Sequence, residues 1–135
     1  MMLGAGLRAA RTPLQIREEI KSALRTFPAL VRDKEPSHAA EQQRIIDAAD
    51  ILYNEATADL LRNGADDLFF ENYLRFSVYM LFNKNGEGSR SPLSRLEKKY
   101  PEEFRRALGQ LPPKERKFIR KEIRSFRESL VRGNG

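Results

Sequence analysis

The chain has 135 residues, with 25 Lys and Arg against 19 Asp and Glu, and its net charge is +6 at neutral pH. This length suits one domain with its own core and is too short for two. Because the chain has no cysteine and a single histidine, disulfides, thiolate metal sites and multi-histidine metal centres are excluded, and histidine-dependent nucleophilic catalysis is disfavoured.

The first twelve residues are basic. Arg8 and Arg11 occur there, and no acidic residue precedes Glu18. Organellar targeting peptides share this composition, although the segment lacks their usual serines. We predict a flexible basic arm at residues 1–12, with a targeting role as the alternative, which leaves a cytoplasmic and an organellar location both open.

Every patterned segment has a helical period and none alternates like a strand, so the sequence predicts an all-α fold. The letters TPLQ predict the start of a first helix, with Thr12 as its cap, Pro13 in the first turn and Gln15 completing a capping box. Pro28 is expected to end or kink this helix.

A second helix is predicted over roughly residues 38–63. Ser37, which follows Pro36, is its expected cap, and Asn63 with Gly64 supplies a left-handed stop. The segment 37–63 holds five acidic and two basic residues, so its net charge is −3. The middle of the chain is therefore acidic while both ends are basic.

A third helix follows, with Asp66 or Asp67 as its cap. Its sequence, LFFENYLRFSVYMLF, is apolar nearly all round, so we expect it to be the strongly apolar central element of a bundle. The alternative is that one aromatic flank of this helix docks on another subunit.

The letters NKNGEGSRSP predict a loop, after which Ser91 as cap and Pro92 in the first turn begin a fourth helical stretch that is kinked or restarts at Pro101. A fifth helix runs from Pro113 to about Arg132. The expected fold is a compact bundle of four to five antiparallel helices in a single domain at 13–132, followed by a disordered tail at 133–135.

No group of residues predicts a reaction. Adjacent carboxylates occur at 18–19, 66–67 and 102–103, all in or beside a predicted first helical turn, where the helix dipole stabilises negative charge. His38 is expected at the surface. We therefore predict no catalytic residue, no cofactor-binding residue and no metal ligand, and a protein that is not an enzyme.

The fifth helix has segregated charge. At 100° per residue its apolar side chains form one stripe, at Ile119, Ile123, Phe126 and Leu130. Basic side chains fill the adjoining arc from about 60° to 200°. These are the predicted partner-binding residues: Arg116, Lys117, Arg120, Lys121, Arg124 and Arg127.

Like charges one turn apart repel each other, at a cost of a few tenths of a kcal/mol per pair in an isolated helix. An anion on this arc would relieve the repulsion. Three anions are candidates: the acidic second helix of the same chain, nucleic-acid phosphates, and an acidic partner surface, either a protein or a membrane headgroup layer. The arc has no aromatic platform, so a nucleic acid would be held by its phosphates and not by stacked bases.

Residues 14–83 combine a capped first helix, a polar RDKEPS break, a long second helix and an aromatic third helix. This order resembles small extrinsic four-helix subunits of photosynthetic complexes, such as the PsbQ family, and accessory helical subunits of mitochondrial complexes. The resemblance rests on helix lengths and apolar spacing, so it transfers no functional residue.

The sequence thus predicts a non-catalytic accessory or assembly subunit that docks on a larger protein complex, an organellar one among the alternatives, through its basic amphipathic C-terminal helix. The expected partners are protein subunits with an acidic surface. The alternative is a helical protein of ribonucleoprotein type that binds phosphate backbones. No stretch approaches the ~18 apolar residues of a membrane span, so we predict no integral membrane helix.

Overall fold

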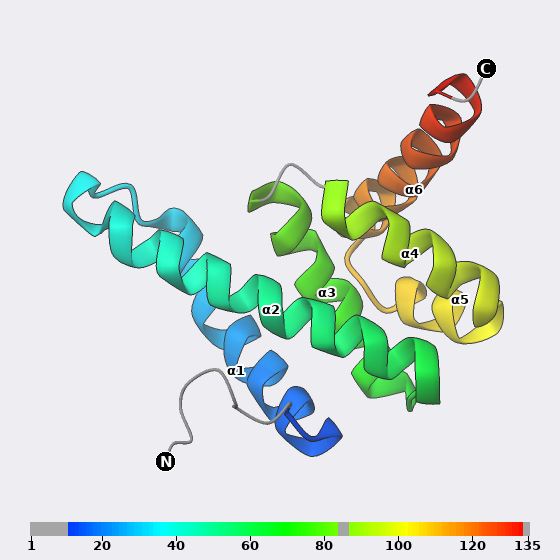
Figure 1. Cartoon of the computed structure of the whole chain (residues 1–135), viewed down its shortest axis with the longest axis horizontal. Helices are drawn as coiled ribbons and strands as arrows, with labels where there is room; N and C mark the ends of the chain where they lie inside the picture. Colours follow the sequence, from blue (N-terminus) through cyan, green and yellow to red (C-terminus); the bar gives the residue numbers. More distant parts are fainter. Residues whose placement is uncertain (1–10, 84–86, 134–135) are drawn as a thin grey trace, which may run out of the picture.

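The computed structural model describes residues 11–83 and 87–133, with side chains at 11–81 and 91–132. Over these residues the chain forms six α-helices and one short 3-10 helix (Figure 1). In chain order they are α1 (Pro13–Arg32), η2 (Pro36–His38), α2 (Ala39–Asn63), α3 (Asp67–Asn83), α4 (Glu87–Lys99), α5 (Pro101–Gly109) and α6 (Pro113–Gly133). Most of the predicted arm at 1–12 and of the predicted tail at 133–135 lies outside the described residues.

The all-α bundle is confirmed, but it has six helices where four to five were predicted. The additional helix arises at Pro101, which has no N–H and keeps the residue before it out of the helical conformation. Tyr100 accordingly has φ −128° and ψ 63°. The fourth predicted stretch is therefore two helices, α4 and α5.

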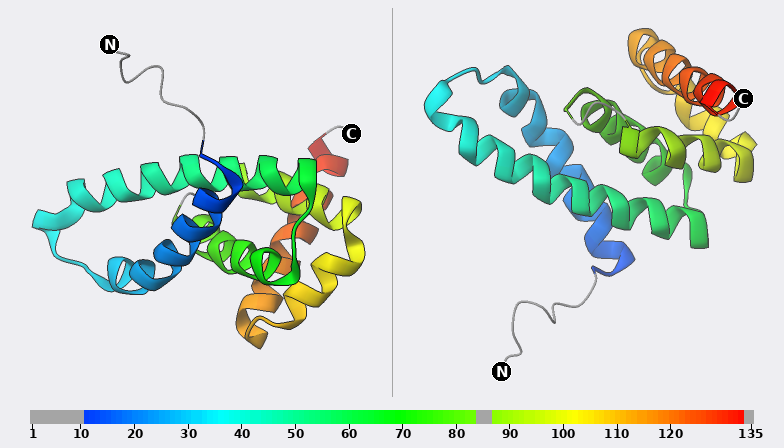
Figure 2. Two further views of the ribbon diagram at one scale, coloured as in Figure 1. Left: turned by 90° about the horizontal axis from the view of Figure 1, so that it is seen from below. Right: turned by 45° about the horizontal axis from the view of Figure 1, so that its top comes forward.

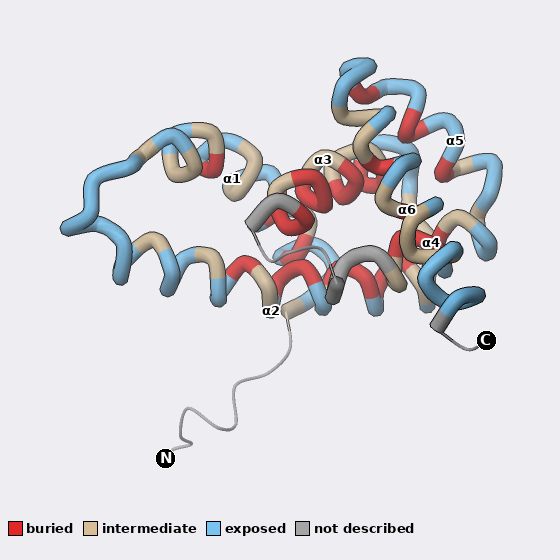
Figure 3. Tube along the Cα trace, turned by 90° about the horizontal axis from the view of Figure 1, so that it is seen from above, coloured by how far each residue is buried: buried red, intermediate tan, exposed pale blue. Residues whose placement is uncertain are grey.

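α3 is the central helix, as predicted. It packs against α1, α2, α4, α5 and α6, and α1 and α2 lie on one side of it while α4, α5 and α6 gather on the other (Figure 2). Its buried turns are evident in Figure 3. The aromatic side chains Phe69, Phe70, Tyr73 and Phe76 are all buried, so this part of the helix offers no exposed aromatic flank for docking.

A buried group of hydroxyls joins α2 to α3. The rings of Tyr53 and Tyr73 stack with centroids 5.0 Å apart. The Tyr53 hydroxyl lies 2.9 Å from Oγ of Ser77, and the Tyr73 hydroxyl lies 2.6 Å from Oγ1 of Thr57. Burial raises the pKa of Tyr73 well above its usual value. Because each hydroxyl has a partner, these polar groups cost the core little.

Three predicted helix boundaries are observed. Thr12 and Gln15 form the capping box, with reciprocal bonds of 3.2 and 2.9 Å. Asp66 caps α3 by accepting the Phe69 N–H at 2.8 Å. Gly64 ends α2 with φ 68° and ψ −169°, a conformation that only glycine adopts readily.

Two other expectations about helix ends were wrong, those for Ser37 and Pro92, and a third was wrong in one of its alternatives. α1 continues through Pro28 to Arg32, so the proline does not end the helix, and the alternative expectation of a kink at Pro28 stays a prediction. Ser37 does not cap α2, because its N–H and hydroxyl both donate to Glu35, which caps η2 instead. α4 begins at Glu87, inside the predicted loop, so Pro92 lies within its second turn, where it removes the one hydrogen bond that an N–H would donate to residue 88.

Candidate docking surface

The six predicted partner-binding residues all belong to α6, and we call them the basic face. They are Arg116, Lys117, Arg120, Lys121, Arg124 and Arg127. The two lysines, Arg120 and Arg124 are exposed, whereas Arg116 and Arg127 are half-buried. The face therefore presents its charge mainly in the middle of the helix.

The apolar stripe of α6 anchors the helix only in its first half. Ile119 and Ile123 are buried against α3 and α4, and Phe126 is half-buried. Leu130, predicted to anchor the helix, is 48% exposed, and Val131 beside it is 77% exposed. The reason is that α6 reaches the edge of the molecule, where its last turns are exposed (Figures 1 and 3).

Arg127 is held by α4. Its Nε donates to Oγ of Ser94 at 3.1 Å, and its Nη2 donates to Oε1 of Glu97 at 2.7 Å. Two such bonds fix the guanidinium and link the second half of α6 to the body of the bundle. Of the predicted binding residues, Arg127 therefore has a structural role as well.

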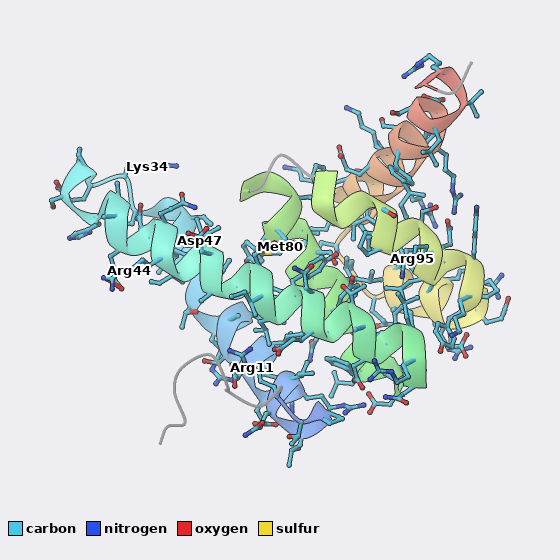
Figure 4. All side chains as sticks on the ribbon, in the orientation of Figure 1. Arg11, Lys34, Arg44, Asp47, Met80 and Arg95 are labelled. Carbon is cyan, nitrogen blue, oxygen red and sulfur yellow. The ribbon has the colours of Figure 1, made fainter. Side chains whose placement is uncertain are left out.

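The acidic helix α2 does not neutralise the basic face. Glu55 accepts from Nη1 of Arg11 at 2.5 Å, and Asp59 accepts from Nδ2 of Asn63 at 2.8 Å. Asp47, which accepts from Gln43, lies on the part of α2 that extends away from α6 (Figure 4). Within the described residues no ion pair joins a carboxylate of α2 to the basic face.

The other five cations of the basic face form no ion pair with any side chain that the structure describes. Arg116, Arg120 and Arg124 stand one turn apart, so their mutual repulsion remains. An external anion bound here would therefore be attracted by all three arginines at once and would reduce their mutual repulsion.

A shallow groove of about 670 Å³ runs beside the basic face between α4 and α6. Its charged walls are four arginines and two glutamates, and its apolar wall is Ile123 with Val131; the charged residues are Arg120, Arg124, Arg127, Arg132, Glu97 and Glu128. Since Glu97 is already bound to Arg127, the groove has an excess of positive charge next to an exposed apolar side chain.

Two negative findings apply to the part of the chain that the structure describes. No group of three or more His, Asp or Glu side chains lies close enough together to hold a metal ion. No helix there has both the length and the apolar content needed to cross a bilayer.

Comparisons with protein-family models, with curated proteins and with solved structures find no match to this chain. The resemblance to extrinsic and accessory four-helix subunits therefore gains no support from them. A functional proposal has to rest on the geometry of the surface itself.

The helical-wheel projection of the α6 sequence did not predict the groove between α4 and α6. Its second wall is supplied by α4 through Ser94 and Glu97, and the sequence gives no sign that α4 and α6 are neighbours. Arg132 and Val131 were also missed, because the apolar stripe suggested that the whole helix lies flat on the core. One signal was available: at 100° per residue Val131 falls at about 120° from Ile119, inside the basic arc and outside the apolar stripe.

Proposed function

We propose that this protein is a non-catalytic accessory or assembly subunit that docks on a larger protein complex through the basic face of α6. One observation carries the proposal: five cations on one helix have no ion-pair partner among the described residues, while Glu55 and Asp59 of α2 are bound elsewhere. Charge left unneutralised in this way favours an oppositely charged partner surface.

The composition of the groove favours a protein partner. Glu128 interrupts the positive wall, and Val131 places an exposed apolar side chain inside the same groove. A polyphosphate backbone gains nothing from either residue. An acidic protein segment gains from both, because its own basic residues can meet Glu128 and an apolar side chain can pack on Val131.

The test is whether the full chain co-purifies with a larger complex from its native source. We expect the tagged chain to elute from size exclusion far above its own mass. Replacing Arg120, Lys121 and Arg124 by glutamine should return it to monomer size, because three of the unpaired cations are lost.

The matched control is the triple replacement of Arg25, Arg95 and Lys98 by glutamine. These exposed cations lie on α1 and α4, so the change in net charge is identical. The control should stay with the complex. A wild-type chain that elutes alone, or a control released as readily as the α6 variant, would contradict docking through this face.

The spacing of Arg116, Arg120 and Arg124 favours a second candidate, the binding of nucleic-acid phosphates. The chain contains 17 Arg and 8 Lys, and arginine is well suited to phosphate. Titration of duplex DNA and RNA at several salt concentrations separates the two functions. Binding that falls steeply with salt and ignores sequence supports nucleic acid, and no binding at low salt eliminates it.

A further inference from the structure

A second concave site lies where α1, α3 and α6 meet. It is a cavity of about 560 Å³, lined by residues from the end of α1 and the turn after it, the second half of α3 and the first turns of α6. It shares no residue with the basic face or with the groove beside that face. Its volume is within the range of about 300–1,000 Å³ that small-molecule sites occupy. The cavity is therefore large enough for a ligand of its own.

The less exposed part of the lining is apolar. Val31, Val78 and Phe118 supply aliphatic and aromatic surface, and the ring of Tyr79 extends it. Val78 is buried, and both aromatic side chains pack against the hydrophobic core. Tyr79 also makes an edge contact with Phe27, at 5.6 Å between centroids. Such a wall can take up the apolar body of a ligand but provides no charge to hold it.

Two lysines from different elements supply the exposed part of the lining. Lys34 belongs to the turn after α1 (Figure 4), and Lys114 belongs to the first turn of α6. Neither forms an ion pair with any side chain that the structure describes. Two ammonium groups at one cavity without a carboxylate partner favour an anion there.

One carboxylate lines the cavity as well, but it does not cancel this charge. The Oε1 atom of Glu115 is closed to solvent, so a ligand in the cavity does not meet it. Burial and next the charge of Glu115 raise the pKa of Tyr79, whereas the charges of Arg32 and Arg75 act in the opposite direction. Arg75 is bound to Glu71, but Arg32 adds a third cation near the site. The cavity and its surroundings thus have an excess of positive charge.

We propose that this cavity binds a small amphipathic carboxylate, a molecule with an apolar body and one terminal carboxylate group. The body packs on Val31, Val78 and Phe118, and the carboxylate lies at the exposed side, where Lys34 and Lys114 both attract it. A neutral ligand of the same shape gains only the apolar contact, because a charge-assisted hydrogen bond is about twice as strong as a neutral one. A ligand with an ammonium group is repelled by both lysines.

The experiment uses the full chain and two probes of the same shape, hydrocinnamate and its neutral amide. Calorimetric titration at low salt should show hydrocinnamate binding about tenfold more tightly than the amide. High salt should reduce this advantage, because exposed ammonium groups are screened. In methyl NMR spectra both probes should shift the signals of Val31 and Val78, where their shared phenyl group packs. This comparison needs no variant, so it stands even if a substitution unfolds the protein.

The variant combines Lys34→Gln with Lys114→Gln. Both side chains are exposed, so the fold should be retained. We expect the variant to weaken hydrocinnamate about tenfold and to leave the amide unchanged within about twofold. The matched control combines Arg25→Gln with Lys98→Gln, which removes the same charge at exposed positions outside the cavity. It should leave both affinities unchanged.

Equal binding of hydrocinnamate and its amide would overturn the proposal, as would a hydrocinnamate that does not bind. So would an advantage over the amide that survives in the lysine variant or is lost equally in the control. The absence of shifts at Val31 and Val78 at saturating probe would place the ligand elsewhere and overturn it too. None of these results bears on the basic face, because the cavity shares no residue with it.

Discussion

α2 and α6 carry charges of opposite sign, and they differ in how many of these charges have partners within the chain. Two acids of α2 are bound within the chain, Glu55 to Arg11 and Asp59 to Asn63. In α6 one cation, Arg127, is bound to Glu97, and the others of the basic face have no described ion-pair partner. Charged side chains of α2 thus form bonds within the chain, whereas most of the basic face of α6 is left for an external partner.

The two helices differ in their apolar residues too. α2 buries its stripe over its second half, with Leu52, Ala56 and Leu60 at most 5% exposed. α6 buries Ile119 and Ile123 and then leaves Leu130 and Val131 in solvent. Whether the charge of a helix is bound within the chain therefore depends on its neighbours in the fold.

The largest expected difference in unfolding free energy is between alanine variants of two leucines, one in each helix. Leu60→Ala in α2 empties a site that is 0% exposed and should cost about 2–5 kcal/mol of unfolding free energy. Leu130→Ala in α6 removes a side chain that is 48% exposed and should change it by no more than about 0.5 kcal/mol. Urea denaturation of both variants measures the difference. Similar losses would show that the end of α6 is packed in solution.

A smaller difference in unfolding free energy is expected when one charged side chain of each helix is neutralised. Glu55→Gln breaks a pair whose side chains are 26% and 24% exposed and should cost about 1 kcal/mol. Arg120→Gln removes a cation with like charges one turn away on both sides and should stabilise the protein by a few tenths of a kcal/mol. Denaturation midpoints in low salt measure both. If Arg120→Gln destabilises the protein as much as Glu55→Gln, the basic face is bound within the chain.

The smallest effect concerns the turn before α2. The Glu35 N–H donates to Asp33, and His38 Nδ1 lies 2.7 Å from the same carboxylate; both lower the pKa of Asp33. A carboxyl with a lowered pKa stabilises the fold above its unfolded pKa, about 3.9, and loses this contribution as pH falls through the lower folded value. Stability curves from pH 6 to 3 for wild type and Asp33→Asn should therefore converge in acid. Parallel curves would contradict this account.

The sequence predicted the core well because its signals are local. A helix that is apolar on all sides has to be central, and α3 is. Thr12, Asp66 and Gly64 act within a few residues of themselves, so their caps and stop were readable without the tertiary structure.

The sequence failed where a competing neighbour decides the outcome. Ser37 does not cap α2, because its own N–H and hydroxyl both donate to the side chain of Glu35. Pro92 indicated a helix start, but the helix begins five residues earlier, at Glu87, so the proline lies in its second turn. The basic face was found by its period, whereas the groove beside it depends on the packing of α4, which no periodicity within α6 encodes.

The stacked pair of Tyr53 and Tyr73 has a practical consequence. The chain contains four tyrosines and no tryptophan, and Tyr79 and Tyr100 also pack on the core. Near-ultraviolet absorbance and circular dichroism therefore report on the interior without any label. In alkaline solution the Tyr73 phenol resists ionisation because of its raised pKa, so a late rise of phenolate absorbance marks the opening of the α2–α3 junction.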